Sequence, residues 1–151
     1  MKKIELGDIF EINTPKGKAY LHYIALNVVG VEIIRVLPGL YEKEPKDLMV
    51  VATADERYMV AFPVAAAARK KIVNKVGHLS ANKYKKPKYM RTKNCIGKDI
   101  KGWHIVDTDS MKRQFVEKLT PEQQKLSPWG HWNDTLLIEN LVDNWSLKKW
   151  K

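Results

Sequence analysis

The stretch GDIFEINTPKGKAYLHYIAL, residues 7–26, predicts two strands of a β-sheet and the turn that joins them. Residues 14–17 (Thr-Pro-Lys-Gly) are typical of a type I turn, because proline presets the backbone at the second position and Gly17 tolerates the positive dihedral that follows. We expect strands near residues 8–13 and 18–26. Both faces of the second strand carry bulky side chains, which indicates a strand that is covered on both sides.

The chain beyond this hairpin continues as short strands and helices. Residues 31–37 and 57–62 are rich in β-branched and aromatic residues and predict two further strands. Pro63 at the front of an alanine run predicts a short helix over 64–70. Residues 46–54 and 70–76 are compatible with either helix or strand.

The second half of the chain has weaker signals until its end. Residues 77–101, which hold much of the lysine, glycine and proline, are expected to form a long irregular connection. Residues 103–106 predict a strand, and residues 114–119 are expected to pair with it. Thr120-Pro121-Glu122-Gln123 has the composition of a helix start.

The final helix is expected to begin near Asn133 or Asp134, either of which can cap it. Its apolar side chains form one continuous stripe of Leu137, Ile138, Leu141, Val142 and Trp145. We therefore expect Trp132 and Trp145, which flank this stripe, to pack into the core.

These elements predict an α+β fold in a single domain over residues 1–151. The expected architecture is mainly an antiparallel β-sheet or partial barrel, with a few short helices and a C-terminal amphipathic helix. Residues 146–151, where Trp150 lies among lysines, are a candidate disordered tail.

Composition narrows the class of protein. The 151 residues are 44% hydrophobic and 29% charged, as in ordinary globular domains. No apolar run approaches the roughly 18 residues that would cross a bilayer, and no long apolar segment follows the first lysines as in a secretory signal. Cys95 is the single cysteine, so the sequence provides no intramolecular disulfide. We expect a cytoplasmic protein without a membrane partner.

The formal net charge of +10 comes mostly from one segment. Residues 83–101 carry 8 basic and 1 acidic side chains, a net of +7, whereas residues 102–151 carry 7 of each. Such a segment attracts anionic partners. Tyr84 and Tyr89 lie among its lysines, and aromatic rings among cations can stack on single-stranded bases.

Catalytic and metal-binding motifs are weak. The four histidines (His22, His78, His104 and His131) lack the spacing of a helical metal pair, and His22 and His104 are expected to pack within strands. Asp107 and Asp109 could hold a divalent metal, but two aspartates at a strand end more often form a turn. Cys95 has no obvious base partner. We expect no catalytic residue, no cofactor and no metal.

Five motifs in order along the chain resemble the immunity protein 26 family of bacterial polymorphic toxin systems. They are residues 7–12 (GDIFEI) with 15–20 (PKGKAY), 34–39 (IRVLPG), 62–67 (FPVAAA) and 132–139 (WNDTLLIE). The resemblance implies an α+β protein, encoded beside a toxin gene, that protects the producing cell by binding the toxin. It implies no catalytic residues, and it places toxin binding in loops where members differ.

The leading hypothesis is therefore an immunity protein that occludes its cognate toxin, which the adjacent gene would encode. The candidate partner-binding residues lie in loops or in the basic segment: Tyr41, Glu42, Glu44, Tyr84, Lys85, Lys86, Lys88, Tyr89, Arg91 and Trp129. Trp129, on a turn between Pro128 and Gly130, is either an interface anchor or a lid over the core edge. The alternative is a small nucleic-acid-binding module that uses residues 83–93. The positive charge predicts an acidic toxin surface or binding away from a phosphate groove.

Overall fold

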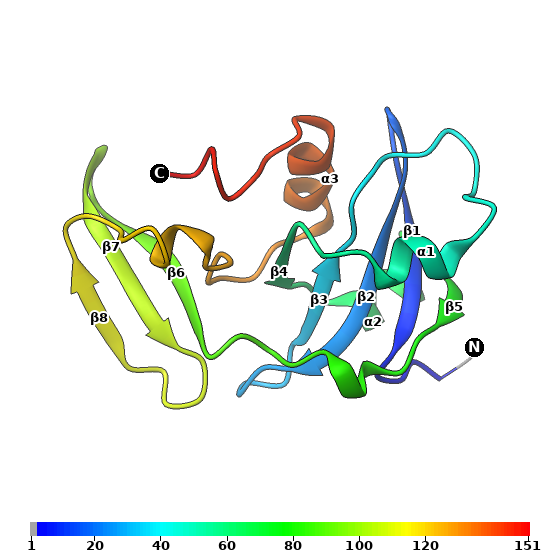
Figure 1. The fold of residues 1–151 in the computed structure, drawn as a ribbon, viewed down its shortest axis with the longest axis horizontal. Helices are drawn as coiled ribbons and strands as arrows, with labels where there is room; N and C mark the ends of the chain where they lie inside the picture. The colour runs from blue at the N-terminus through cyan, green and yellow to red at the C-terminus, as the bar shows by residue number, and fades with distance from the viewer. Residues whose placement is uncertain (1–2) are drawn as a thin grey trace.

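The computed structural model describes residues 3–151, which form two antiparallel sheets and three short helices. Five strands make the larger sheet in the order β4-β3-β2-β1-β5, and three make the smaller sheet in the order β6-β7-β8. Figure 1 shows the two sheets at opposite ends of the molecule, with α3 and the C-terminal segment between them. The predicted α+β class is confirmed, and within the described residues neither sheet closes into a barrel.

The strands of the larger sheet are β1 (Asp8–Thr14), β2 (Gly17–Leu26), β3 (Glu32–Val36), β4 (Tyr58–Ala61) and β5 (Val73–His78). The smaller sheet comprises β6 (Tyr89–Ile96), β7 (Asp99–Asp107) and β8 (Arg113–Val116). The helices are α1 (Leu48–Thr53), α2 (Val64–Arg69) and α3 (Asp134–Val142), and two 3₁₀ turns are η1 (Ala81–Lys83) and η2 (Gln123–Lys125).

The larger sheet is buried on both faces, as the pattern of β2 predicts. On one face Phe10, Leu21 and Ile34 pack with Leu137 of α3 in the main hydrophobic cluster. On the other face Ile9, Tyr20 and Leu37 pack with Val51 and Ala52 of α1. Burying apolar area of this kind is the main stabilising contribution to such a domain.

The structure resolves both ambiguous segments. Residues 48–53 are helical, and the Asp47 side chain caps α1 by accepting a hydrogen bond from the Met49 amide at 3.0 Å. Residues 73–78 are strand β5, because β1 offers them an antiparallel partner from Asp8–His78 to Ile12–Val73. The expected helices after Pro63 and Asn133 are both confirmed, as α2 and α3.

The expectation of an irregular connection over residues 77–101 is wrong. Residues 89–96 form β6, which turns through Gly97 and Lys98 into β7 and pairs with it along its whole length. The pattern hid the strand because one of its faces carries Tyr89, Arg91 and Lys93 rather than apolar side chains. Arg91 of this face packs instead on the buried Trp103 of β7, with 4.8 Å from its guanidinium carbon to the ring centre.

The segment from Ser127 to Trp132 joins the two sheets. On one side the Arg91 amide of β6 donates to the Ser127 carbonyl at 3.0 Å, and the Trp129 amide donates to the Arg91 carbonyl at 2.7 Å. On the other side the Trp132 amide donates to the Ala61 carbonyl of β4 at 2.9 Å. The smaller sheet is therefore tied to the edge of the larger one by backbone hydrogen bonds.

The expected helix at Thr120 is reduced to the single turn η2. Thr120 and Gln123 do form the predicted reciprocal cap, with Gln123 N to Thr120 Oγ1 at 3.1 Å and Thr120 N to Gln123 Oε1 at 2.9 Å. The chain then becomes extended at Leu126, because the following residues pair with β6. Tertiary pairing thus ends a helix that local sequence favours.

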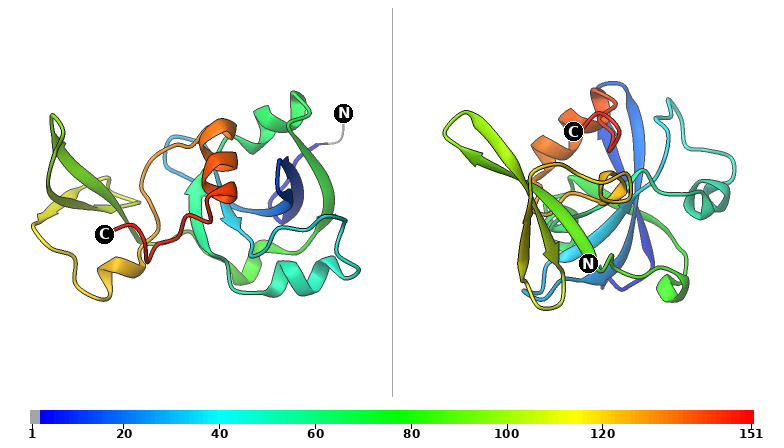
Figure 2. Two further views of the ribbon diagram at one scale, coloured as in Figure 1. Left: turned by 90° about the horizontal axis from the view of Figure 1, so that it is seen from above. Right: turned by 60° about the vertical axis from the view of Figure 1, so that its left-hand side comes forward.

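The C-terminal residues pack between the two sheets. The Trp150 ring lies 4.9 Å from that of Trp103 in β7 and 5.5 Å from that of Trp145. Trp145 in turn lies 5.0 Å from Tyr58 of β4. Within the candidate disordered tail, Trp150 contacts the smaller sheet and Leu147 packs against the main hydrophobic cluster, and Figure 2 shows the tail running from α3 toward the smaller sheet.

Candidate functional site

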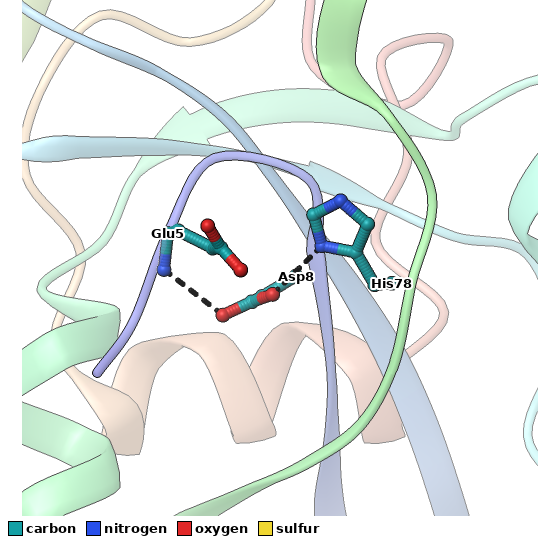
Figure 3. A group of neighbouring side chains, drawn as sticks. All are labelled: Glu5, Asp8 and His78. Atoms are coloured by element: carbon teal, nitrogen blue, oxygen red, sulfur yellow. Dashed lines mark hydrogen bonds and ion pairs between the residues drawn. The ribbon is translucent and has the colours of Figure 1, made fainter. Parts of the chain in front are cut away.

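The first polar cluster is built around Asp8, which has no exposed surface. Its Oδ2 accepts a hydrogen bond from the Glu5 amide at 2.9 Å. Its Oδ1 lies 2.9 Å from His78 Nδ1 and 3.0 Å from Lys75 Nζ, both on β5. Figure 3 shows Asp8 between Glu5 and His78, where the start of β1 meets the end of β5.

The ligand-type atoms of Glu5, Asp8 and His78 lie within 4.8 Å of one another, which is close enough to share a metal ion. Burial raises the pKa of Asp8, but the Glu5 amide, His78 and Lys75 together hold it below the usual value of 3.8. The Lys75 ammonium already supplies the positive charge that this carboxylate needs. The arrangement is best suited to fastening β5 to β1.

Gly7 explains why the chain can fold so tightly at this cluster. Its φ is +101°, and a Cβ at this position would lie 2.7 Å from the Leu79 carbonyl oxygen. The Gly7 amide donates to the Tyr23 carbonyl at 2.7 Å, and its carbonyl accepts from the Leu79 amide at 2.8 Å. Glycine at position 7 is thus required by backbone geometry.

A second cluster lies under α1, around the buried guanidinium of Arg35. Its Nη1 donates to the Ala52 carbonyl at 2.8 Å and lies 3.0 Å from His22 Nδ1, while its Nη2 donates to the Ala54 carbonyl at 2.7 Å. The ring of Tyr84 covers it, with 3.9 Å from the guanidinium carbon to the ring centre. Arg35 therefore anchors α1 and the segment after η1 to the sheet.

His22 is fully buried and hydrogen-bonded within β2, as expected. Its Nε2 lies 2.7 Å from the Leu79 carbonyl oxygen, so Nε2 carries the proton and Nδ1 accepts from Arg35. Burial, reinforced by the Arg35 charge, lowers the pKa of His22. The ring is neutral and structural at neutral pH.

The third cluster surrounds Arg91, which has no exposed surface. Its guanidinium donates to four carbonyl oxygens: Leu126 at 3.0 Å, Gln124 at 2.9 Å, Leu147 at 3.1 Å and Trp150 at 2.6 Å. The rings of Trp103 and Trp150 lie 4.8 and 4.5 Å from it. Burial lowers the pKa of Arg91 to about 10. This cation holds η2 and the C-terminal segment against β6.

The predicted partner-binding residues are therefore divided by the structure. Arg91 is withdrawn from the surface entirely, and Tyr84 is half-buried against Arg35. Lys86 Nζ lies 2.7 Å from Asp109, and Lys88 Nζ lies 3.9 Å from Asp107. The basic segment is thus partly engaged with the rest of the chain.

The remaining predicted residues do not gather at one place. Tyr41 is half-buried, forms a bridge with Lys18 and packs at 5.8 Å against the Tyr20 ring. Trp129 is half-buried beside β6. Five predicted residues are exposed: Glu42 and Glu44 in the loop before α1, and Lys85, Lys88 and Tyr89 at the start of β6 and the segment before it.

The two aspartates considered as a metal site have a structural role. The Asp107 carboxylate accepts hydrogen bonds from the Asp109 and Ser110 amides at 2.9 and 3.1 Å, so the two aspartates form the expected turn. These amides hold the pKa of Asp107 below its usual value. Cys95 is an exposed free thiol near the end of β6.

The smaller sheet carries exposed apolar side chains that sequence reasoning missed. Ile96, Ile100 and Phe115 are 66%, 53% and 47% exposed. Figure 1 shows the turn between β6 and β7 extending away from the rest of the molecule. We name Ile96, Ile100 and Phe115 the hairpin surface. Only the pairing of β6, β7 and β8 places these residues in one sheet, where Ile96 pairs with Asp99 and Ile100 with Cys95, so the two isoleucines point to opposite faces.

Sequence reasoning also missed His78 as a partner of Asp8, because the two are 70 positions apart.

Comparisons with family models, curated proteins and solved structures found no match for this chain. Among the described residues, no helix has the length and apolar character needed to cross a membrane.

Proposed function

We propose that this chain is a cytoplasmic immunity protein, which binds a cognate toxin and neutralises it without catalysing a reaction. The resemblance of five ordered motifs to the immunity protein 26 family supplies the proposed class of protein. The observation that carries the proposal is the hairpin surface, where three large apolar side chains remain exposed on a sheet that extends from the molecule. Large apolar side chains left exposed on a projecting element are candidate contacts for a protein partner.

The hairpin surface is suited to anchor a partner. Apolar area removed from water contributes roughly 25 cal/mol per Å², and a few large side chains near the centre of an interface usually supply most of its affinity. Phe115 fits such a role because its ring already lies against Gly102 on one side. A stable complex would bury on the order of 1,600 Å² in total, so neighbouring loops would also take part.

The charge of the chain contributes mainly to the rate of association. With a net charge of +10, we expect encounter with an acidic toxin surface to be fast at low salt and slower as salt rises. Stopped-flow association with the toxin from the adjacent gene, measured from low to high salt, tests this. An association rate that does not change with salt would contradict the steering role.

The main experiment co-expresses the toxin with two variants of this chain. The double variant Ile100→Asp and Phe115→Asp should bind the toxin at least 100-fold more weakly and fail to protect the cell. The control is Met49→Asp with Val50→Asp on α1, which removes two exposed apolar side chains from the larger-sheet end of the molecule and should protect like wild type.

Three results would count against these proposals. If wild type does not protect, the proposed function is wrong. If the α1 variant loses protection and the hairpin variant keeps it, the partner binds at the other end of the molecule. If both variants protect fully, the hairpin surface is not the anchor.

The second candidate is a nucleic-acid-binding module built on residues 83–93. Tyr89 is exposed, and Lys88 Nζ lies 5.6 Å from its ring centre, an arrangement that could accept a base and a phosphate. Tyr84, the other aromatic ring of the segment, is already covered by its contact with Arg35. Gel shifts with oligonucleotides should show salt-sensitive binding that Lys85→Glu with Lys88→Glu abolishes, if this candidate is right.

A further inference from the structure

A groove of about 600 Å³ lies between η2 and the C-terminal segment. Its lining comprises Arg57, Pro121, Gln124, Lys125, Ser146, Leu147, Lys148 and Lys151. We name it the tail groove. Its volume falls within the range of known ligand-binding clefts.

The lining of the tail groove is strongly positive. Four of its side chains are cations, and no carboxylate side chain lines it. Arg57 is held by neutral partners, donating to Asn144 Oδ1 at 2.6 Å and to the Trp145 carbonyl at 2.9 Å. Of the four cations, only Lys125 has an ion-pair partner among the described residues, an exposed pair with Glu122 at 3.6 Å. The groove therefore presents positively charged side chains to an occupant, three of them without an ion-pair partner among the described residues.

Both walls of the groove are anchored to one buried cation. Arg91 bonds to the carbonyls of Gln124 and Leu126 at the η2 wall, and to those of Leu147 and Trp150 at the tail wall. The spacing of the walls is thus set within the folded chain before any partner arrives. Such preorganisation reduces the ordering cost of binding.

The chemistry of the walls favours carboxylates over nucleotides. No aromatic ring lines the groove. The rings of Trp145 and Trp150 are turned into the stack with Trp103, so bases would find no stacking platform here. Leu147 and Pro121 offer aliphatic contact instead.

We propose that the tail groove binds an acidic peptide segment of the partner protein, with carboxylates on its cations and an aliphatic side chain against Leu147. This inference rests on the proposed function only in identifying the partner as the toxin. It also accounts for a basic immunity protein, because the docking segment itself would be acidic.

The binding test uses a synthetic peptide of alternating glutamate and leucine, titrated into the full ¹⁵N-labelled chain. The expected result is saturable shifts at the amides of Ser146 and Leu147. The variant Lys125→Glu with Lys148→Glu should bind the peptide at least 10-fold more weakly. A matched control, Arg69→Glu with Lys70→Glu at the end of α2, has the same change in net charge at exposed residues outside the groove, and it should change affinity less than twofold.

Several outcomes would overturn the inference. An equal loss of peptide affinity in both variants would show that the peptide is attracted by net charge and does not bind specifically in the groove. The absence of saturable shifts would show that the groove does not take such a peptide. An oligothymidine that binds more tightly than the peptide and shifts the same amides would assign the groove to nucleic acid.

Protection of cells from the toxin separates the two proposals. If wild type protects and the Lys125→Glu, Lys148→Glu variant protects equally well, the tail groove is not the toxin contact and the immunity function stands. If wild type does not protect, the immunity function fails, and the peptide titration alone decides whether the groove takes acidic segments. Loss of protection in the groove variant, with the α2 control unaffected, supports both.

Discussion

Replacing Arg91 by methionine should destabilise the fold more than any exposed substitution in the same sheet. The guanidinium makes four hydrogen bonds to carbonyl oxygens of η2 and the C-terminal segment, between 2.6 and 3.1 Å long. Methionine can fill much of the space but donates none of them. The change would leave these carbonyls without their donor and loosen the contacts of Trp150 with Trp103.

The size of the effect follows from these contacts. A hydrogen bond to a charged group contributes about 1.5–3 kcal/mol, and stacking of a buried cation on an aromatic ring adds up to about 2 kcal/mol. Desolvating the guanidinium opposes both, because it costs several kcal/mol. We therefore expect Arg91→Met to lower the free energy of unfolding by about 3–5 kcal/mol, a large share of the 5–15 kcal/mol typical of a domain.

Urea unfolding followed by tryptophan fluorescence measures this loss, since Trp103, Trp145 and Trp150 all report on the same region. Arg91→Lys keeps the charge but not the planar fork, and it should lose at least about 2 kcal/mol. The matched control is Arg113→Met on β8, an exposed arginine, which should stay within about 0.5 kcal/mol of wild type. A loss below 1 kcal/mol for Arg91→Met, or one equal to that of the control, would refute the structural role assigned to this cation.

Three further changes have expected outcomes. His22→Gln should weaken the pH dependence of the free energy of unfolding. Burial and the Arg35 charge lower the pKa of His22 in the folded chain, so the unfolded chain takes up this proton first as pH falls below about 6.5. In that range wild type should lose up to about 1.4 kcal/mol of stability per pH unit. Urea unfolding curves at pH 7.5 and 5.5 measure this, and the same loss of unfolding free energy between the two pH values in both proteins would contradict it. Gly102→Ala should cost at least about 2 kcal/mol and speed amide exchange in β8, because φ is +135° and the new Cβ would lie 2.6 Å from a β8 carbonyl oxygen; Gly97→Ala, with open space around it, should cost less. Asn133→Ala should lower the unfolding free energy by about 1 kcal/mol through loss of the α3 cap, and calorimetry showing no change would exclude the cap as a contributor.

Local signals account for the parts of the fold that were predicted correctly. The turn at residues 14–17 and the proline at position 63 act on their own backbone, and Asn133 caps the helix that follows it. The burial of both faces of β2 could be predicted from the sequence because each face carries large apolar or aromatic side chains. These features depend on neighbours within a few residues.

The candidate sites were less predictable for a physical reason. Asp8 and His78 meet across strands that are 70 positions apart, and Arg91 bonds to carbonyls 33 to 59 positions away. Backbone carbonyls carry no residue-specific signal, so no pattern in the sequence could mark them as ligands of a buried arginine. The basic segment was predicted to be a free, charged loop because its partners, such as Asp107 and Asp109, cannot be identified from the sequence.

The amino-acid sequence by itself determined the first hairpin, the capped final helix and the positive charge, since these depend on dihedral preferences, caps and side-chain type. Tertiary structure alone decided that residues 73–78 are a strand, that Arg91 is buried and that a cationic groove forms beside the C-terminal segment. Each of these results depends on long-range partners: β1 for β5, four distant carbonyls and two tryptophans for Arg91, and two separate segments for the groove. Hydrogen bonds and apolar burial between such partners outweigh weak local preferences, so they become visible only when the chain has folded.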